Sequence, residues 1–330
     1  MKKLAAILLL ISLTFCLGAC SPREMTVRGF AMGSDYYVTY TASNDLSTDV
    51  KEILSSIEES FSVRVDSSVI NRINAARASE TILLTEEEGA VLGRVLHVAE
   101  VTEGAFEPAI LPLVKVWGFD PPFEMNKKVP PSTQSIDDAR LISGYGYFTY
   151  SEATSSVVKS IDDACLDLGG AIKGYAAERV REAIKERCDE ALVYVGGTIA
   201  AVGRDYEIGV TPPRESEESY AFRFTLGKNE ICATSGDYER YYFYEGKRYH
   251  HIIDASTGYP ADAGVISATV VSEDGILADA LATAVVVLGV EKASALLEKC
   301  GAKGIIVTTD KKIVTCGISV TIKDTSYALG

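Results

Sequence analysis

The stretch that most constrains how this chain folds runs from Thr234 to Pro260, where an aromatic run from Tyr238 to Tyr244 lies between turn signals. A turn signal at residues 235–237 opens the stretch. Glu245-Gly246 then separates two segments with the composition of β-strands. Strands on either side of a two-residue turn form a hairpin. The pattern therefore predicts a β-hairpin, and we expect the rest of the chain to be organised around it.

Polar residues gather at the end of this stretch, where His250, His251, Asp254 and Thr257 follow the tyrosines. One interpretation is a β-meander whose tyrosines form a half-buried surface. The other is a binding site for a heteroaromatic ligand, because flat rings beside groups that both donate and accept hydrogen bonds suit such a ligand. The residue types alone leave both interpretations open.

The beginning of the chain has the pattern of a secretory signal peptide, with two lysines, an apolar run and small residues before Cys20. The apolar run is short for a membrane span, which takes about 20 residues. The sequence Leu17-Gly18-Ala19-Cys20 resembles a bacterial lipobox, and an ordinary signal peptide with a nearby cysteine is the alternative. We therefore expect a lipoprotein signal peptide over residues 1–19, a tether over 20–26 lipidated at Cys20, and a single domain over 27–330. The protein would be exported and held by lipid on the outer face of the cell membrane or on the periplasmic side.

Charge and composition exclude several classes of partner. The formal charge is −14, and removing Lys2 and Lys3 with the signal peptide takes it to −16. An acidic domain without a basic block is not expected to bind nucleic acid. With only three histidines in the chain and no closely spaced cysteine pair, a zinc site is not expected either. A bound metal would instead be a hard ion with oxygen ligands, and the cysteines after Cys20 are predicted to be buried free thiols.

Periodicity and capping signals predict helices and strands along the domain. Thr85 with Glu88 is a capping box that opens a helix ending near Glu103. The segment SVRVDSSVINRIN is predicted to be a polar loop, and the only tryptophan, Trp117, a packing anchor. The other predicted helices lie at 49–61, 172–184, 276–288 and 292–300. A strand pair or one bent strand is predicted at 27–40, and further strands lie at 147–150, 157–161, 191–195, 198–202, 206–210, 220–226, 265–271, 304–308 and 312–316.

Two segments carry the chemistry of an anion or metal site. Gly169-Gly170 precedes a predicted helix, where backbone groups approach an anion closely, and Lys173 lies one turn further on. A plain strand-to-helix turn with a solvated lysine is the alternative. Asp279 and Thr283 are four residues apart in an apolar helix and so share a face. Because burying an unpaired carboxylate is costly, a bound cation accounts best for Asp279.

Taken together, the motifs resemble those of one family, the ApbE family of FAD:protein FMN transferases. The resemblance covers nearly the whole mature chain. It rests on Met32-Gly33, residues 68–74, 104–108, 167–170 with 173–174, Gly196-Gly197, 234–236 with Tyr238, 251–258, and 278–279 with Thr283.

The resemblance implies an α+β fold of mixed β-sheets with flanking helices. It also implies two closely packed lobes with FAD in the cleft between them, and an Mg²⁺-dependent transfer of FMN from FAD to a Thr or Ser hydroxyl of a target protein. That target would be a membrane redox-pump subunit or an exported flavoprotein. By position, the residues implied to contact FAD are Met32, Ala105, Phe106, Glu107, Asp167, Lys173 and Ile253, and those implied to bind magnesium are Gly170, Asp279 and Thr283.

The sequence departs from the family pattern in two places. Glu107 stands where an aspartate is usual and is one methylene longer, so its ligand contact would run through water. Val63-Arg64 stands where many members carry a flavin-facing tyrosine, so that contact is absent or is replaced by stacking of the guanidinium.

His251 and Asp279 are both candidates for orienting or deprotonating the acceptor hydroxyl. Asp279 is poorly suited to act as both metal ligand and base, so His251 is preferred. Two other functions stay open at this point: a hydrolase that splits FAD into FMN and AMP, and a flavin-binding lipoprotein without catalysis. The predicted metal-binding pair Asp279 and Thr283 argues against simple flavin binding, because binding alone does not require a metal at the pyrophosphate. Nothing in the sequence separates the transferase from the hydrolase.

Overall fold

The computed structural model describes residues 21–120 and 129–330. The predicted signal peptide and Cys20 lie outside these residues, as does part of the predicted loop at 121–135. Among the helices that are described, none has both the length and the apolar character needed to cross a bilayer.

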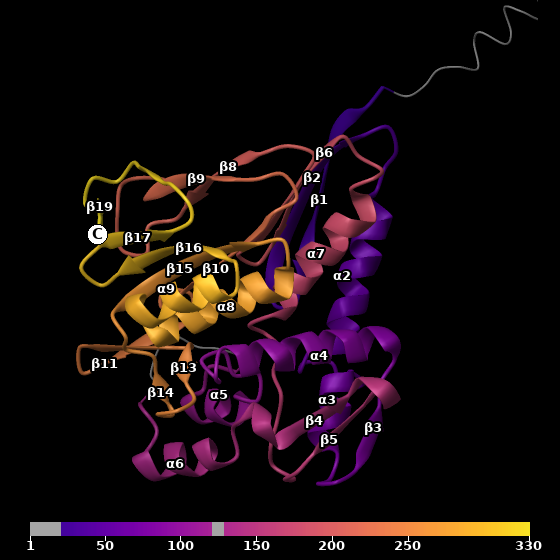
Figure 1. Cartoon of the computed structure of the whole chain (residues 1–330), viewed down its shortest axis with the longest axis vertical. Helices are drawn as coiled ribbons and strands as arrows, with labels where there is room; N and C mark the ends of the chain where they lie inside the picture. Colours follow the sequence, from indigo (N-terminus) through magenta and orange to yellow (C-terminus); the bar gives the residue numbers. More distant parts are fainter. Residues whose placement is uncertain (1–20, 121–128) are drawn as a thin grey trace, which may run out of the picture.

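A nine-stranded sheet forms the centre of the upper part of the molecule in Figure 1. Its strand order is β1-β2-β6-β7-β10-β15-β16-β17-β19, and every neighbouring pair is antiparallel except β17 and β19. The strands are β1 Arg23–Ala31, β2 Ser34–Ala42, β6 Glu190–Val195, β7 Thr198–Val202, β10 Ile231–Gly236, β15 Val265–Ser272, β16 Lys303–Thr308, β17 Lys312–Cys316 and β19 Ala328–Leu329.

Four helices pack against one face of this sheet: α2 Ser47–Phe61, α7 Ile172–Ile184, α8 Gly275–Leu288 and α9 Val290–Lys299. Helix α2 buries Val50, Leu54, Ile57 and Phe61 on the face that its apolar periodicity predicts. Helix α8 is buried on nearly all sides because it lies against β10 and β15 and also contacts α4 and α7. Its apolar composition follows from that position.

A small sheet, in the order β18-β9-β8, forms a second core around Phe222 and Phe224. Its strands are β8 Tyr206–Val210, β9 Phe222–Leu226 and β18 Thr321–Ile322. This core also takes in side chains from the large sheet, including Cys232, Ile266 and Ile305. The two layers therefore enclose apolar side chains of the large sheet that the four helices do not cover.

The lower part of the molecule in Figure 1 holds four more helices and a second three-stranded sheet, ordered β3-β5-β4. Its elements are α3 Val69–Ala75, β3 Thr81–Leu83, α4 Glu86–Val101, α5 Leu111–Trp117, α6 Thr133–Leu141, the 3₁₀ turns η1 Tyr145–Tyr147 and η2 Glu152–Thr154, β4 Phe148–Ser151 and β5 Ser156–Lys159. The capping box of Thr85 and Glu88 is present at the start of α4, as predicted.

The prediction of a polar loop before residue 75 was wrong, because this segment contains α3. The Ser68 hydroxyl caps the helix by accepting a hydrogen bond from the Asn71 backbone N–H. Val69, Ile70 and Ile73 then lie buried on one side. The signal was present as a Ser N-cap before an i, i+1, i+4 apolar pattern, but the surrounding polar residues obscured it.

The tyrosine-rich stretch forms the predicted hairpin, with β11 Tyr241–Tyr244 pairing antiparallel to β12 Lys247–His250. A second small pair, β13 Ile253–Asp254 and β14 Tyr259–Pro260, follows it. The predicted turn at 235–237 was displaced: Ser235 and Gly236 end strand β10, and the turn begins at Asp237. Pairing of Ser235 with Ala268 of β15 extends the strand past the local turn signal.

Trp117 is a packing anchor, as predicted. Its ring stacks on Tyr249 at a centroid distance of 5.5 Å, and its Nε1 donates a hydrogen bond to the Gly258 carbonyl at 2.7 Å. These contacts join α5 to the hairpin region. The cysteines of the described residues are free thiols, as predicted, but only Cys232 among them is buried.

Candidate active site

The predicted site residues meet at one end of the large sheet, where it joins the lower part of the molecule (Figure 1). The turn between β1 and β2 carries Met32 and Gly33, and the turn between β6 and β7 carries Gly196 and Gly197. Antiparallel pairing of Tyr36 with Val195 places these two turns at the same end. Long-range strand order therefore assembles motifs that are far apart in the sequence.

The β1–β2 turn has little free space. Gly33 has a φ of +72°, and a Cβ at this position would lie 2.5 Å from the guanidinium nitrogens of Arg64. Only glycine permits this backbone conformation and this close approach without strain. The Met32 backbone N–H donates to Glu58 Oε1 at 3.1 Å, which ties the turn to α2. The guanidinium of Arg64 therefore lies against the turn that carries Met32 and Gly33.

Hydrogen bonds from two residues that the sequence did not single out as functional fix the segment before α7. Asn74 clamps Leu166 with both amide atoms, at 2.9 and 2.7 Å. Lys159, which is 1 % exposed, donates to the carbonyls of Asn74, Asp162 and Ala164. These bonds fix the chain immediately before Asp167.

Lys173 lies in the first turn of α7 with its ammonium directed back toward the glycine pair. Its Nζ donates to the Gly169 carbonyl at 2.6 Å and is 3.9 Å from Asp279 Oδ2. The alternative of a solvated lysine is therefore not supported. A positive charge at a helix N-terminus is a suitable partner for phosphate.

The residues implied to bind magnesium also come together. Asp279 is 4 % exposed, and its Oδ2 accepts a hydrogen bond from the Gly174 backbone N–H at 3.0 Å. Thr283 Oγ1 is 3.2 Å from Ser235 Oγ, and a Cβ on Gly170 would lie 3.5 Å from the same Thr283 oxygen. Gly170, Asp279 and Thr283 thus line one small region between α7 and α8.

The chemistry of these donors fits Mg²⁺. Within residues 21–120 and 129–330, no group of three or more His, Cys, Asp or Glu side chains is placed to hold a metal. Asp279 supplies one carboxylate, and in the described part of the chain no hydrogen-bond donor contacts its Oδ1. Magnesium is commonly bound by one or two carboxylates together with waters and substrate phosphates. One buried carboxylate beside neutral oxygens matches that pattern.

Phe106 and Glu107 approach from the lower part. A Cβ on Gly170 would lie 3.2 Å from the Phe106 ring, so this ring faces the glycine pair. Glu107 is 8 % exposed, and its Oε1 accepts from the Ala109 backbone N–H at 2.8 Å. Burial raises the pKa of Glu107 to about 7, although backbone hydrogen bonds partly oppose the shift. Its carboxyl is therefore partly protonated at neutral pH.

Glu107→Gln is expected to stabilise the apoprotein at high pH. Because the folded-state pKa of Glu107 lies above its ordinary value of 4.5, the free energy of unfolding falls as pH rises from about 4.5 to 7. The neutral glutamine removes this loss, so its advantage over wild type should grow by about 3 kcal/mol across that window. Urea unfolding at pH 5 and pH 8 measures the change, with Glu100→Gln at an exposed position as the control. If the free energies of unfolding of the variant and the wild type differ by the same amount at the two pH values, the prediction is contradicted.

His250 and His251 separate as their adjacent positions predict. His250 is 6 % exposed and its Nε2 contacts the Ala261 carbonyl at 2.9 Å, whereas His251 is only partly buried. Burial, together with the positive charges of Arg240 and Lys173 and the neighbouring His250, lowers the pKa of His251 well below 6.5. The imidazole is neutral at pH 7, as a proton acceptor must be.

Ile253 is a predicted site residue whose side chain is turned into a core. Its side chain is 5 % exposed and packs in the core that contains Trp117, Phe119 and Tyr242. A contact between this residue and a ligand would have to involve its backbone. Ala105 is partly buried beside Phe106.

Arg240 is a site residue that the sequence reasoning missed. It lies between the turn that follows β10 and the start of β11, and its electrostatic neighbours are Asp167, Arg64 and Glu239. Burial is the largest cause that lowers the pKa of Arg240; the charge of Asp167 opposes it and that of Arg64 adds to it, yet the side chain retains solvent exposure. Both properties are expected of a group that lines an open cleft. Only its place next to the aromatic run hinted at this role.

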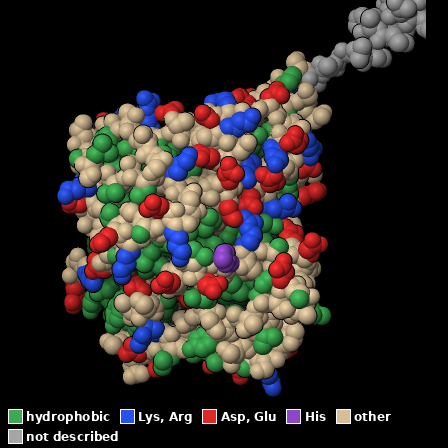
Figure 2. Space-filling model, in the orientation of Figure 1, with side chains coloured by type: hydrophobic (Ala, Val, Ile, Leu, Met, Phe, Trp, Pro, Cys, Tyr) green, Lys and Arg blue, Asp and Glu red, His purple; other side chains and the backbone are tan. Residues whose placement is uncertain are grey.

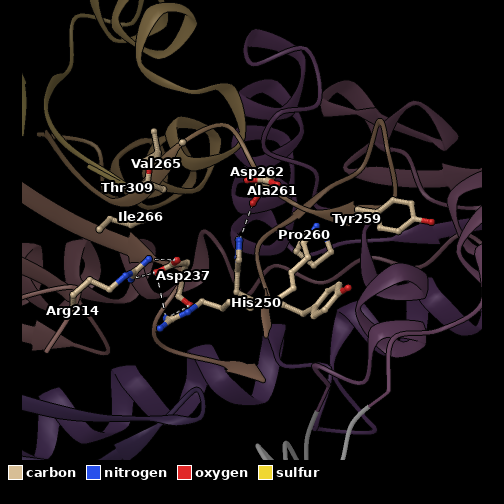
Figure 3. Close-up of a pocket in the computed structure, with 14 residues that line it drawn as sticks. Arg214, Asp237, His250, Tyr259, Pro260, Ala261, Asp262, Val265, Ile266 and Thr309 are labelled. Carbon is tan, nitrogen blue, oxygen red and sulfur yellow. Dashed lines mark hydrogen bonds and ion pairs between the residues drawn. The ribbon is translucent and has the colours of Figure 1, made fainter. Parts of the chain in front are cut away.

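A separate cavity of about 280 Å³ is lined by His250 but not by His251 (Figure 3). Arg214 binds Asp237 with two hydrogen bonds of 2.7 Å at its wall, and Arg248 is 3.7 Å from the same carboxylate. These contacts largely neutralise the charges of the wall. The cavity contains none of the predicted metal or flavin contacts and is not the candidate site.

Comparisons with known proteins agree in pointing to one family. The model of the ApbE family matches residues 32–306. The FAD:protein FMN transferase of Vibrio cholerae serotype O1 is 30% identical over 302 residues, covering 88% of this chain and 89% of the relative. That of Treponema pallidum is 31% identical over 287 residues, covering 80% and 77%.

Solved structures give the same result for the fold. The crystal structure of the ApbE protein of Thermotoga maritima is similar with a TM-score of 0.78 and 32% identity, covering 92% of this chain and 98% of that one. The flavin transferase ApbE from Vibrio cholerae gives a TM-score of 0.78 at 25% identity, covering 93% and 98%. The predicted α+β fold of mixed sheets and flanking helices is confirmed.

Proposed function

The chain belongs to the ApbE family, and from that membership we infer that it is an FAD:protein FMN transferase. The family model spans most of the chain, and the curated relatives that carry this name are covered over most of their length. FAD is its substrate and a protein is its acceptor. We therefore prefer the transferase to the two alternative functions, an FAD hydrolase and a non-catalytic flavin-binding protein.

We propose further that FMN is moved onto a Thr or Ser hydroxyl of the target. The hydroxyl oxygen attacks the phosphorus on the FMN side of the pyrophosphate and forms a phosphoester, while the bond to the bridging oxygen breaks and AMP leaves with the electron pair. Positioning and charge neutralisation govern such phosphoryl transfer. The target would be a membrane redox-pump subunit or an exported flavoprotein.

We propose that Asp279, Thr283 and the Gly170 backbone bind Mg²⁺ and that Lys173 stands beside it. Bound magnesium would neutralise phosphate charge and stabilise the leaving group. Acidic and basic side chains are interspersed over the face in Figure 2, but the formal charge of the chain is −14, so a bound cation would offset the repulsion between the protein and the pyrophosphate. Lys173 binds and orients the pyrophosphate, and His251 accepts the proton of the attacking hydroxyl.

The observation that carries this assignment is the buried Asp279 carboxylate, 3.9 Å from Lys173 Nζ and on the same helix face as Thr283. The test incubates the protein with FAD, Mg²⁺ and a candidate target that carries the acceptor hydroxyl. Mass spectrometry then measures FMN attached to the target against FMN free in solution. Attached FMN with an equal amount of AMP supports the transferase, and free FMN alone would instead indicate hydrolysis.

We also propose that the mature protein is lipidated at Cys20, on the basis of the sequence Leu17-Gly18-Ala19-Cys20. The protein is expected to partition into the detergent phase and to begin with a lipid-modified cysteine. The Cys20→Ala variant should lose that partitioning and keep FMN transfer, since the cysteine precedes the domain. Recovery of the wild-type protein in the aqueous phase, cleaved at another residue, would contradict the proposal.

A further inference from the structure

The backbone carbonyl of Arg240 contacts His251 twice. It accepts a hydrogen bond from the His251 backbone N–H at 3.0 Å, and His251 Nδ1 lies 3.3 Å from the same oxygen. A carbonyl oxygen only accepts, so Nδ1 must carry the proton in this contact. In a neutral imidazole the other nitrogen, Nε2, then keeps its lone pair. The contact thus selects one of the two tautomers.

Arg240 is itself held at its other end. Its Nη1 donates to the Phe119 carbonyl at 3.1 Å, just beyond the C-terminus of α5. The Phe119 ring packs against Tyr242 of β11 at a centroid distance of 5.7 Å. The side chain therefore bridges α5 and the start of the hairpin, and this bridge fixes the carbonyl that meets His251.

The charges around His251 also affect the protonation state of its imidazole. Burial is the largest cause that disfavours the imidazolium of His251. The charged and titratable groups around it, Arg240, His250 and Lys173, add to this effect, whereas the hydrogen bond to the Arg240 carbonyl opposes it. Arg64, Asp167 and Glu239 surround Arg240 in turn. Within the described residues, Arg240 has no carboxylate within ion-pair distance, so its charge is not cancelled by a close ion pair.

We propose that Arg240 is the positioning residue of His251, holding its imidazole with Nδ1 protonated and Nε2 available to the acceptor hydroxyl. This inference rests on the proposed function for its consequence in catalysis. The backbone carbonyl sets the tautomer, the link to Phe119 sets the place of that carbonyl, and the guanidinium charge adds to burial in disfavouring the imidazolium. Arg240 does not need to touch either substrate for this role.

The direct test is ¹⁵N NMR of the full protein labelled with ¹⁵N-histidine. The chain has three histidines, and the variants His97→Gln and His250→Gln assign the His251 signals. We expect Nδ1 of His251 to be protonated at neutral pH. A spectrum in which Nε2 carries the proton would overturn the proposal whether or not FMN transfer is observed, so the tautomer is decided independently of the enzymatic activity.

Two substitutions separate charge from anchoring. Arg240→Gln removes the charge, so the titration midpoint of His251 and the acid limb of kcat/KM should both move to higher pH. Arg240→Lys keeps the charge and should restore both toward wild type. Arg223→Gln on β9, where the arginine is half exposed and pairs with Glu207, is the matched control and should change neither.

An unchanged His251 midpoint in Arg240→Gln would overturn the role of the guanidinium. A similar loss of kcat at every pH in both Arg240 variants, without movement of the acid limb, would also overturn it and would indicate a merely structural contact. If Arg240→Gln fails to fold, two measurements still test the positioning role of Arg240: the His251 tautomer of the wild type, and the His251 titration midpoint of Arg240→Lys compared with that of the wild type. If the wild type transfers no FMN, the proposed function fails, and the NMR measurements judge the positioning separately.

Discussion

Asp279→Asn is expected to reduce magnesium-dependent FMN transfer on the order of 10³-fold, because a neutral amide no longer offsets the charge of a bound cation. Asparagine has nearly the size of aspartate, and its side-chain oxygen can still accept the hydrogen bond from the Gly174 backbone N–H. The fold should therefore survive. Asp279→Ala should be equally inactive but less stable, since it leaves that N–H buried without a partner.

The measurement is the initial rate of FMN attachment as a function of Mg²⁺ concentration, together with a thermal melt of each variant. Asp310→Asn serves as the control, since this aspartate is exposed and lies on a surface turn. Wild-type activity in the folded Asp279→Asn variant would remove Asp279 from the metal site. Activity restored at high Mg²⁺ would instead show a weakened site and would support the assignment.

His251→Ala is expected to slow FMN transfer by about 10²–10⁴-fold, or about 3–5 kcal/mol of barrier, while FAD affinity changes little. The reason is the loss of the proton acceptor for the target hydroxyl. Because the pKa of His251 is lowered well below 6.5, the ring stays neutral as pH falls through that value. The acid limb of the wild-type rate should thus lie below pH 6.5, and the variant should lack this limb.

His250 is a poorer control than its sequence position suggests. His250→Ala should leave the rate per folded enzyme near wild type but lower stability by about 1–3 kcal/mol, because it removes a buried side chain bonded to the Ala261 carbonyl. His97→Ala, at a position 72% exposed, is the neutral comparison. If His251→Ala loses FAD binding rather than rate, or matches His250→Ala in activity, His251 is a ligand contact and not a base.

Local sequence determined the elements whose signals lie within a few residues of one another. The capping box at Thr85, the apolar face of α2 and the two-residue turn of the hairpin required no distant partner, and each formed as predicted. The family motifs likewise identified Asp279, Thr283 and Lys173. These side chains converge because α7 packs against α8, which brings Lys173 and the Gly174 backbone N–H to Asp279.

Tertiary structure decided what depends on contacts between distant residues. Ser235 reads locally as a turn, yet pairing with β15 holds it in a strand. The clamp of Asn74 on Leu166 and the buried ammonium of Lys159 join segments about ninety residues apart, and no local pattern encodes them. Arg240 became a site residue, and the pKa of His251 moved, only because folding placed Phe119, Lys173 and the hairpin together. Electrostatic effects and packing depend on distance in space, which the order of residues does not specify.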